Sequence, residues 1–331
     1  MDFVNLADRK HEAFGLTRYC FGDYEAFINW ALDRADNIYA LMAGGKPVAQ
    51  IIDTRADICV RGKAYAASLI SHVCVAPEYR GQRVMPELMG MTLDTLRRDG
   101  VAIAQLYPNS HEYYTRYGFA DCGEAVVMTV PLSTLHGAFG PCSNLWTGPA
   151  LDADTAALLM MYGGAMREYS GWVIRDETRM RQRLAELAIF GAYAVYTRDV
   201  QYNGYAVYHF ENNMIVVDEF VAGDADSRKH LLAFFGSHMS THSTVRITTS
   251  ADDPLRRLVL DRKGMVSLEP WSMYCVLDYD AFGLSDINDI SEHDKTRLIL
   301  GDAHREDMQD STLRHWRDAF PCRPVWIYEQ Y

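Results

Sequence analysis

The chain lacks the features of membrane and disulfide-rich proteins. None of its apolar runs reaches the ~18 residues that a membrane helix needs. The first residues, MDFVNLADRKHEAF, contain no apolar signal-peptide core. The seven cysteines are scattered, odd in number and without a C-x-x-C pair, which argues against a disulfide framework. We therefore expect reduced thiols, no membrane contact and a cytoplasmic location.

Basic residues are also scarce. Lysine and arginine total 32 against 44 aspartates and glutamates, which gives a formal net charge of −12. Nucleic acid is a poor partner for such a chain, because its affinity depends on cationic side chains that neutralise phosphates. The charge favours cationic partners such as polyamines, aminoglycosides or basic protein tails, although many cytosolic proteins are equally acidic.

A metal site is not expected either. His238 and His242 have the i,i+4 spacing that places two side chains on one helix face. No glutamate lies between them and no third ligand is evident, so a solvated helix end is the simpler interpretation.

In the first part of the chain, the pattern predicts alternating helices and strands. The predicted elements are helical residues 1–30, strands Asn37–Ile52 and Asp53–Val75 with a turn at Gly44–Lys46, a helix Pro86–Arg98, and strands Val101–Leu106 and Glu124–Leu132. This order predicts the α/β (α+β) class, with a mixed β-sheet flanked by helices.

A segment rich in glycine and proline, Ser133–Pro149, is predicted to be a linker. After it the order of elements repeats, without an obvious repeat of residues. The predicted elements are helical Leu151–Leu187, strands Tyr193–Thr197, Gly204–Phe210 and Met214–Val221, a helix Ser227–Met239, a strand Thr244–Thr249, a helix Pro254–Asp261 and a strand Ser272–Leu277. The pattern predicts two similar domains, 1–135 and 150–280.

The remaining residues, 281–331, are too few for a large core of their own. They predict two short helices, Glu292–Leu300 and Ser311–Phe320, and an aromatic tail, FPCRPVWIYEQY. Chain ends are usually polar and frayed. An aromatic tail therefore predicts that other parts of the protein hold it in place.

The segment Ser71–Met89, SHVCVAPEYRGQRVMPELM, carries the clearest chemical signal. It predicts a strand to Val75, a proline turn, a loop containing arginine and glycine, and a helix. That order places free backbone N–H groups and a helix N-terminus beside the end of a strand, an arrangement that binds phosphate or pyrophosphate. Arg80 and Arg83 add cationic donors.

A second element follows in Val101–Phe119, where an apolar strand leads to a short helix ending at Gly118. The second domain lacks the corresponding phosphate loop. It has Gly223-Asp-Ala-Asp226, whose aspartates would cap a helix and repel a pyrophosphate. We therefore expect only the first domain to bind a pyrophosphate-containing ligand.

Together these motifs resemble the acetyl-CoA fingerprint of the GCN5-related N-acetyltransferases (GNAT). In that family a V-x-V strand precedes an R-G-x-G-x-G/A loop, and Y-x-x-x-G-F supplies a tyrosine acid. One competent and one degenerate GNAT domain followed by a C-terminal segment resembles the Eis (enhanced intracellular survival) family. The matching segments are SHVCVAPEYRGQRVM, LYPNSHEYYTRYGF, GYAVY, TTSADDPLRRLVLD and LRHWRDAFPCRPVWIYEQY. In that family a third domain with a sheet helps to build a hexamer, and from the resemblance we expect this chain to keep only the terminal helices and tail of that domain.

The resemblance implies a role for each matching residue. Val73 and Val75 would pair through their backbones with the pantetheine arm of CoA. Tyr114 would be the acid, and the terminal carboxylate of Tyr331 the base. The implied CoA-binding set is completed by Arg80, Gly81, Gln82, Arg83, Val84, Met85 and Asn109.

Arg83 and Met85 stand where the fingerprint has glycines. A non-glycine residue is expected to need ordinary φ and ψ angles there and to bring bulk close to the phosphates. The positive charge of Arg83 could compensate as a donor.

Four further residues are candidates for the acceptor site. His72 would line the acceptor pocket or serve as an alternative base, and Trp30 would form a wall. Asp23 and Glu112 would attract a cationic amine. Each has an ordinary alternative: a hydrogen-bonded strand histidine, a packing tryptophan and two surface carboxylates.

The resemblance implies an acetyl-CoA-dependent N-acetyltransferase, with acetyl-CoA as co-substrate and no metal. The acceptor would be a primary amine of a cationic substrate, either an aminoglycoside-like small molecule or a peptide lysine, and the protein a homo-oligomer. Tyr114, starting near pKa ~10, suits protonation of a thiolate of pKa ~8.5, and a buried α-carboxylate starting near ~3.5 suits a base. The alternative is a non-catalytic acyl-CoA-binding regulatory protein, which Arg83 and Met85 favour.

Overall fold

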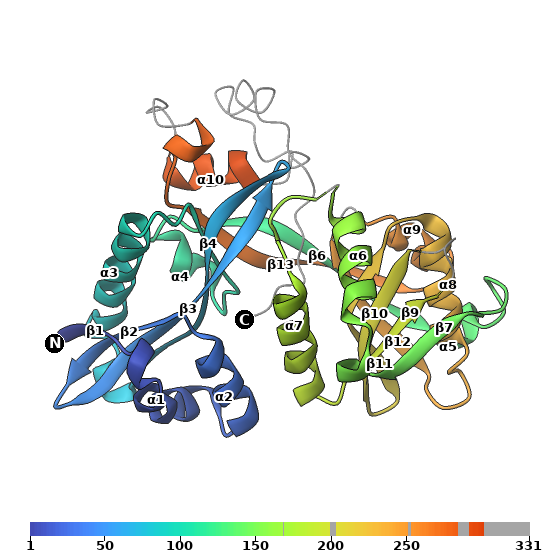
Figure 1. The fold of residues 1–331 in the computed structure, drawn as a ribbon, viewed down its shortest axis with the longest axis horizontal. Coiled ribbons are helices and arrows are strands. Elements are labelled where there is room, and N and C mark those ends of the chain that lie inside the picture. The colour runs from blue at the N-terminus through green and yellow to red at the C-terminus, as the bar shows by residue number, and fades with distance from the viewer. Residues whose placement is uncertain (168, 199–202, 251–252, 284–290, 301–331) are drawn as a thin grey trace. The chain divides into compact units, whose positions relative to one another are not determined.

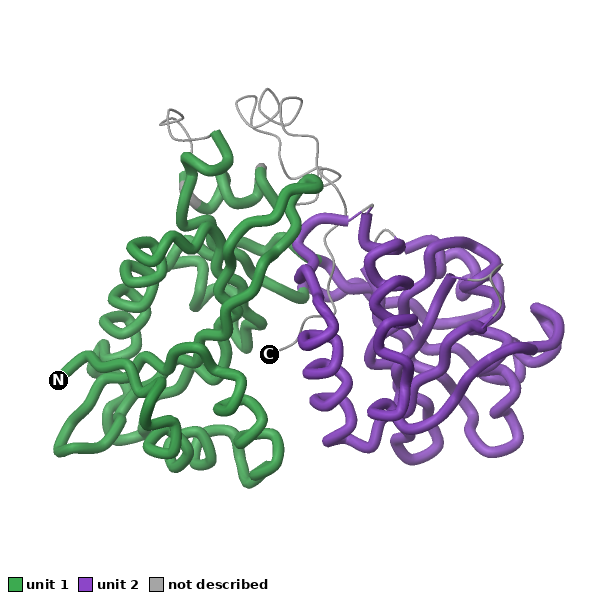
Figure 2. The backbone as a smooth tube through the Cα atoms, in the orientation of Figure 1, with its two compact units in different colours: residues 1–123, 271–325, 329–331 green, residues 124–270, 326–328 purple. Residues whose placement is uncertain are grey.

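The computed structural model describes residues 1–167, 169–198, 203–250, 253–283 and 291–300. The chain forms two compact units (Figure 2). Unit 1 contains 1–123 and resumes at Trp271, and unit 2 spans Glu124–Pro270. The division falls within two long strands, β6 (Ala120–Pro131) and β13 (Met265–Val276). The sequence pattern instead places the boundaries near 135 and 281, because a strand that continues from one unit to the next carries no breaker residue.

Unit 1 contains a mixed sheet whose strands pair in the order β1-β2-β3-β4-β5-β13. The first five strands are β1 (Asp2–Asn5), β2 (Asn37–Ala43), β3 (Lys46–Val60), β4 (Lys63–Val75) and β5 (Ile103–Leu106). Only the pairing of β4 with β5 is parallel. The helix α3 (Val84–Arg98) makes the crossover between these two strands (Figure 1).

Two tight turns shape the long hairpins of this sheet. Gly44 and Gly45 both have positive φ, at 57° and 76°, which confirms the predicted turn. A second turn at Arg61 (φ 52°) and Gly62 (φ 79°) was missed, so the predicted strand Asp53–Val75 is in fact the end of β3 and all of β4. Arginine is rarely found at positive φ, so the residue types at this position do not indicate a turn.

The side chains of β2 point alternately to the two faces of the sheet, and helices cover both faces. Tyr39 and Leu41 pack in the cluster that includes the apolar face of α3. Ile38 and Ala40 point to the other face, where they pack with residues of α1 (His11–Phe21) and α2 (Glu25–Arg34). The expectation of a helical segment over 1–30 was therefore only partly right. The chain starts with a strand, and the helical part is broken at Gly22, whose φ is 92°.

The described C-terminal residues belong to unit 1. The end of β13 pairs antiparallel with β5, with Met273 opposite Leu106. Helix α10 (Glu292–Leu300) has the predicted bounds, and its Thr296 Oγ1 accepts a 3.2 Å hydrogen bond from the Val276 backbone N–H. The predicted helix Ser311–Phe320 and the tail with Tyr331 lie outside the described residues.

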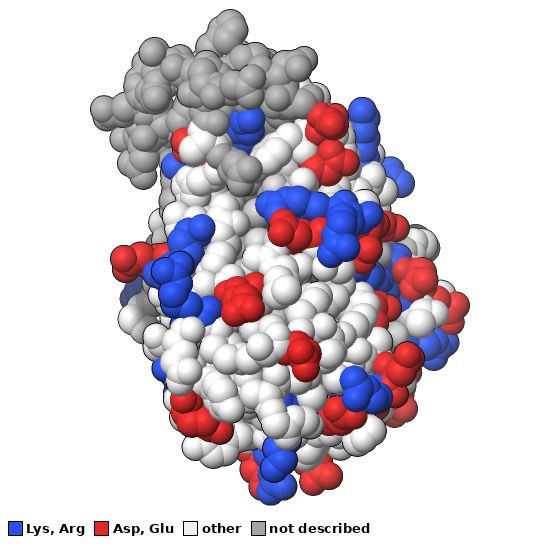
Figure 3. Space-filling view, turned by 90° about the vertical axis from the view of Figure 1, so that its left-hand side faces the viewer, with Lys and Arg blue, Asp and Glu red and all other residues white. Residues whose placement is uncertain are grey.

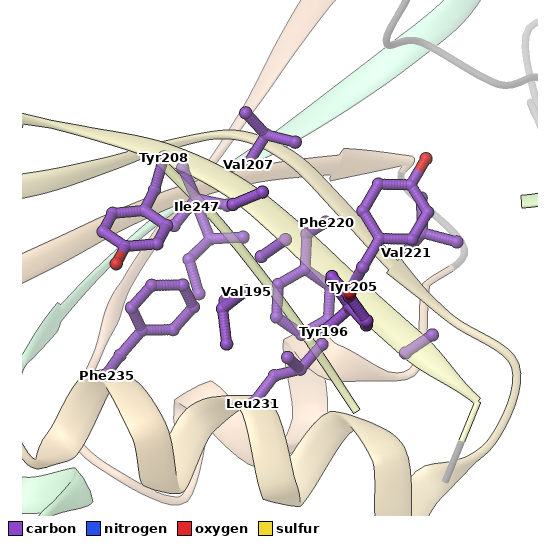
Figure 4. Close-up of a cluster of buried hydrophobic side chains, with 14 of the residues drawn as sticks. Val195, Tyr196, Tyr205, Val207, Tyr208, Phe220, Val221, Leu231, Phe235 and Ile247 are labelled. Carbon is purple, nitrogen blue, oxygen red and sulfur yellow. The ribbon is translucent and has the colours of Figure 1, made fainter. Parts of the chain in front are cut away.

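Unit 2 has the same order of elements, as predicted. Its strands pair in the order β6-β12-β11-β10-β9-β7. They are the end of β6, β7 (Leu145–Pro149), β9 (Tyr193–Thr197), β10 (Gly204–Glu211), β11 (Met214–Ala222) and β12 (Thr244–Ser250). Again only one pair, β11 with β12, is parallel, and α8 (Ala225–Gly236) links its strands. Figure 4 shows Leu231 and Phe235 of α8 pointing at the strands, with Tyr208 beside Phe235.

Two predictions for the start of unit 2 were wrong. The segment Leu151–Leu187 is not one helix but α6 (Thr155–Met166), the short β8 (Trp172–Val173) and α7 (Glu177–Ile189). Asp176 caps α7 by accepting a hydrogen bond from the Arg179 backbone N–H, so the break has a local cause. The expected linker Ser133–Pro149 contains the edge strand β7 and most of α5 (Leu132–Leu135).

Charges of both signs are distributed over the face drawn in Figure 3. Lysines and arginines lie in small groups beside aspartates and glutamates, around a broad area without charged side chains. The negative excess is therefore not gathered into one patch on this face. Within the described part of the chain, no helix has the length and apolar character that a membrane crossing needs.

Candidate functional site

The parallel strands β4 and β5 stop pairing partway along β4. Their ladder runs from Ala67 opposite Ile103 to Ile70 opposite Leu106, where β5 ends. On its other edge β4 stays paired with β3 as far as Val75. The last residues of β4 therefore have a strand partner on one side only, which leaves backbone groups available on the side of β5.

A β-bulge lies in this half-paired segment. Ser71 is opposite Ile52 and Cys74 is opposite Gln50, so two residues of β4 face one residue of β3. His72, inside the bulge, has a φ of 49°. Bulges of this kind re-aim side chains and are common beside functional sites.

The backbone of Val75 faces away from β3. The next residue, Ala76, donates its N–H to the Val48 carbonyl at 2.8 Å. Because successive residues of a strand direct their backbone groups to opposite neighbours, Val75 directs its own toward the open side. Its carbonyl accepts a 3.1 Å hydrogen bond from Arg80 Nε.

A pocket of about 390 Å³ opens at this place. It is bounded by the end of β4, the end of α1, the loop before α3 and the start of α4 (His111–Thr115). Its lining residues are Cys20, Phe21, Val73, Cys74, Val75, Arg80, Met85, Asn109, Ser110, Tyr113 and Tyr114. The structure thus brings together six residues that the sequence singled out, from three segments of the chain: Val73, Val75, Arg80, Met85, Asn109 and Tyr114.

A larger pocket of about 860 Å³ lies between α1, the β2–β3 turn and the short helix Pro77–Tyr79. None of the predicted site residues lines it. We take the smaller pocket as the candidate site because it combines the strand end, the loop and Tyr114.

The loop before α3 keeps a glycine-like backbone although it contains arginine. Gly81 has a φ of 75°, and Arg83 has φ 61° and ψ 17°, directly before α3 begins at Val84. The expectation of ordinary backbone angles at Arg83 was therefore wrong. The left-handed conformation costs a non-glycine residue about 1–2 kcal/mol. Met85 is helical and buried, so its side chain needs no special backbone.

Tyr114 is placed by a short capped helix. Ser110 Oγ accepts a 3.3 Å hydrogen bond from the Tyr113 backbone N–H at the start of α4. The Tyr114 side chain is 5% exposed and makes edge-to-face contacts with Tyr113 and Phe119. Burial raises the pKa of Tyr114 to about 12. The phenol is therefore protonated at neutral pH and able to donate a proton.

The four predicted acceptor residues do not line the pocket. His72 makes an edge-to-face contact with Phe21, with the ring centroids 5.1 Å apart. Trp30 stacks on Phe27, Asp23 pairs with Arg18 at 2.8 Å, and Glu112 is exposed on α4. For these residues the packing and surface interpretations describe the observed contacts.

Replacing His72 with asparagine should weaken the dependence of the free energy of unfolding on pH at acidic pH. Burial lowers the pKa of His72 to about 4, whereas an unfolded histidine titrates near 6.5. As pH falls, the unfolded chain takes up this proton first, so the free energy of unfolding decreases below pH ~6.5, by about 2–3 kcal/mol at pH ~4.5. Asparagine tolerates the positive φ and does not titrate.

Urea unfolding at about pH 7 and about pH 4.5 measures this difference. The wild type should lose more stability between the two pH values than His72→Asn. Equal losses would show that His72 is not held neutral by burial. The comparison uses the change with pH, so the packing lost with the imidazole ring does not affect it.

Five lining residues were not predicted from sequence: Cys20, Phe21, Cys74, Ser110 and Tyr113. Cys74 was adjacent to two predicted residues on β4, and Ser110 and Tyr113 flank the predicted acid. Cys20 and Phe21 come from the end of α1, more than fifty positions away, and only the fold brings them here.

The corresponding place in unit 2 has the predicted acidic cap. Asp224 accepts hydrogen bonds from the backbone N–H of Ser227 at 2.7 Å and from its hydroxyl at 2.7 Å. Two carboxylates, Asp224 and Asp226, thus stand at the N-terminus of α8. That unit 2 binds no acyl-CoA stays a prediction, with this charge as its physical reason.

His238 and His242, the pair with i,i+4 spacing, make contacts within unit 2. His238 Nδ1 lies 3.1 Å from the Phe234 carbonyl, and His242 stacks on Phe210. Across the described ranges, no three histidine, cysteine, aspartate or glutamate side chains gather closely enough to hold a metal ion.

Both units match known families. Residues 6–122 match one family described as an acetyltransferase (GNAT) domain, and residues 171–276 match a second family with the same description. The chain therefore contains two GNAT domains in tandem. No curated protein sequence matches it.

Solved structures show the same tandem GNAT fold. A protein of unknown function from Enterococcus faecalis V583, described as a probable N-acyltransferase, superposes with a TM-score of 0.73 at 18% identity over 85% of this chain and 73% of that chain. A GCN5-related N-acetyltransferase from Kribbella flavida superposes with a TM-score of 0.70 at 23% identity, over 85% of this chain and 72% of that chain. Eis1 from Mycobacterium abscessus superposes with a TM-score of 0.66 at 18% identity, over 85% of this chain and 75% of that chain.

Proposed function

We propose that this tandem GNAT protein is an acetyl-CoA-dependent N-acetyltransferase whose active site is the 390 Å³ pocket of unit 1. The observation that carries the proposal is the parting of β4 from β5 after Ile70, with Tyr114 in the wall of the resulting pocket. The half-paired strand offers backbone groups to an amide-containing ligand such as the pantetheine arm, and the loop and α3 offer N–H groups to its pyrophosphate.

Each part of the donor has a matching group in unit 1. Val73 and Val75 line the pocket on the unpaired side of β4. Arg80 and Arg83, on either side of Gly81, are cations beside the N-terminus of α3 and suit a diphosphate. The left-handed Arg83 keeps the loop shape that glycine would give, so the substitution does not argue against binding.

The chemistry needs a proton donor for the departing thiolate. Tyr114, with its pKa raised to about 12 by burial, carries the proton at neutral pH and can donate it in a hydrogen bond to the sulfur as the thiolate charge develops. His72 is a poor base for an ammonium group, since burial lowers its pKa to about 4. The proposed base, the Tyr331 carboxylate, lies outside the described residues.

The acceptor class is a primary amine on a cationic molecule, either an aminoglycoside-like compound or a peptide lysine. The net charge of −12 favours the approach of such substrates over anionic ones. Aromatic side chains of Phe21 and Tyr113 in the pocket wall can contact an ammonium group through their ring faces.

An assay of amine-dependent CoA release tests the function. The full chain is incubated with acetyl-CoA and a panel of polyamines, aminoglycosides and lysine peptides, and free CoA is followed with a thiol reagent. We expect release that rises with one class of amine and an acetylated amine detected by mass spectrometry. Tight acetyl-CoA binding without release by any amine would contradict catalysis and favour the acyl-CoA-binding regulatory alternative.

A further inference from the structure

Two of the pocket-lining residues are cysteines that contact each other. Cys20 lies near the end of α1 and Cys74 lies in the half-paired part of β4. Both are reduced and line the 390 Å³ pocket. They pack in one small cluster with Leu16 and Ala76. The proposed acyl-CoA site thus has a pair of thiols in its wall.

The surroundings give the two thiols different reactivity. The neighbouring Cys74 thiol and the positive charge of Arg80 lower the pKa of Cys20, although burial and Glu78 oppose this shift. The neighbouring Cys20 thiol and deeper burial raise the pKa of Cys74. The surroundings therefore favour the thiolate of Cys20 over that of Cys74. Since the thiolate is the nucleophile, Cys20 attacks first and Cys74 acts second.

We propose that Cys20 and Cys74 are a reactive dithiol that the pocket directs toward the disulfide of coenzyme A. In the first step the Cys20 thiolate attacks one sulfur of this disulfide, a Cys20–CoA mixed disulfide forms, and one CoA leaves as the thiolate. In the second step Cys74 loses its proton to solvent and attacks the Cys20 sulfur of the mixed disulfide, and the second CoA leaves as a thiolate. Two protein thiols are oxidised, and one CoA disulfide is reduced to two CoA thiolates, which take up protons from solvent.

The proposal rests on the proposed function, because recognition of the oxidant depends on the CoA-binding groups of unit 1. Those same groups make acetyl-CoA a competitor. The product disulfide joins α1 to β4 across the pocket wall, and it removes the thiol hydrogen bond from Cys20 to the Val75 carbonyl, now 3.8 Å. Oxidation therefore changes the site itself rather than a distant surface.

The test is peptide mapping of the reduced full chain after exposure to CoA disulfide or, in a parallel arm, to glutathione disulfide at the same concentration. We expect a Cys20–Cys74 linked peptide to form at least about tenfold faster with CoA disulfide, and saturating acetyl-CoA to slow its formation. Cys74→Ser should stop at the mixed disulfide with CoA on Cys20. Cys20→Ser should form neither product, while Cys59→Ser, in β3, should behave as wild type.

Equal rates with both disulfides, or no linkage of these two residues, would overturn the proposal. Calorimetry of acetyl-CoA binding to the reduced wild type separates this failure from failure of the proposed function. Binding of acetyl-CoA without selective oxidation removes the dithiol inference alone. Absence of acetyl-CoA binding removes the proposed function and the inference with it.

Discussion

Tyr114→Phe is expected to lower kcat by ~10²–10⁴-fold, the usual contribution of a general acid, and to leave acetyl-CoA affinity almost unchanged. The side chain is buried against Phe119 and Tyr113, so phenylalanine can keep the same packing without the proton. Steady-state kinetics with the best amine and calorimetry with acetyl-CoA measure the two quantities separately.

Tyr117→Phe is the matched control for this variant. The Tyr117 hydroxyl donates a 3.2 Å hydrogen bond to the Tyr113 hydroxyl, but Tyr117 does not line the pocket. Removal of the Tyr117 hydroxyl should change kcat by less than about tenfold. Because the pKa of Tyr114 is raised to about 12, its deprotonation should not limit activity at any pH below that value. Wild-type turnover in Tyr114→Phe would show that this tyrosine only packs.

Arg80→Glu is expected to weaken acetyl-CoA binding by about 100-fold or more, roughly 2.7 kcal/mol. The guanidinium borders the pocket and is fixed by its hydrogen bond to the Val75 carbonyl. Reversing its charge would replace attraction to a diphosphate by repulsion and release that carbonyl. Calorimetry at constant ionic strength gives the affinity, because salt screens such contacts.

Arg83→Gly provides the comparison. Glycine accepts the left-handed backbone of this position without strain, so the loop should keep its shape while it loses one cation. We expect an affinity loss of less than about tenfold and no loss of thermal stability. An unchanged affinity in Arg80→Glu would mean that the diphosphate is not held at this loop.

The sequence was sufficient for the central strand, loop and helix. Val75, Pro77 and Gly81 mark the end of a strand, a turn and a loop by local rules, and Tyr114 lies at a fixed distance before Gly118. In unit 2, the cap by Asp224 also follows from local backbone chemistry. These features depend on residues that are close together in the sequence, so the sequence alone predicts them.

Other features depend on contacts between distant segments. The bulge at His72 comes from the register of β4 against β3, which no residue in β4 reveals by itself. Cys20 reaches the pocket only because α1 packs over the end of β4. Arg83 keeps a glycine-like conformation because the strand before it and the helix after it fix both ends of the loop. A rule based on residue type alone predicts the opposite for Arg83.

Hydrogen exchange with and without acetyl-CoA tests the central claim, that the donor binds along the open edge of β4 in unit 1. The account predicts slower exchange of backbone amides within 73–85 on binding, and no change within 223–228 at the acidic N-terminus of α8. Protection at α8, or unchanged exchange along β4 while acetyl-CoA is bound, would contradict it.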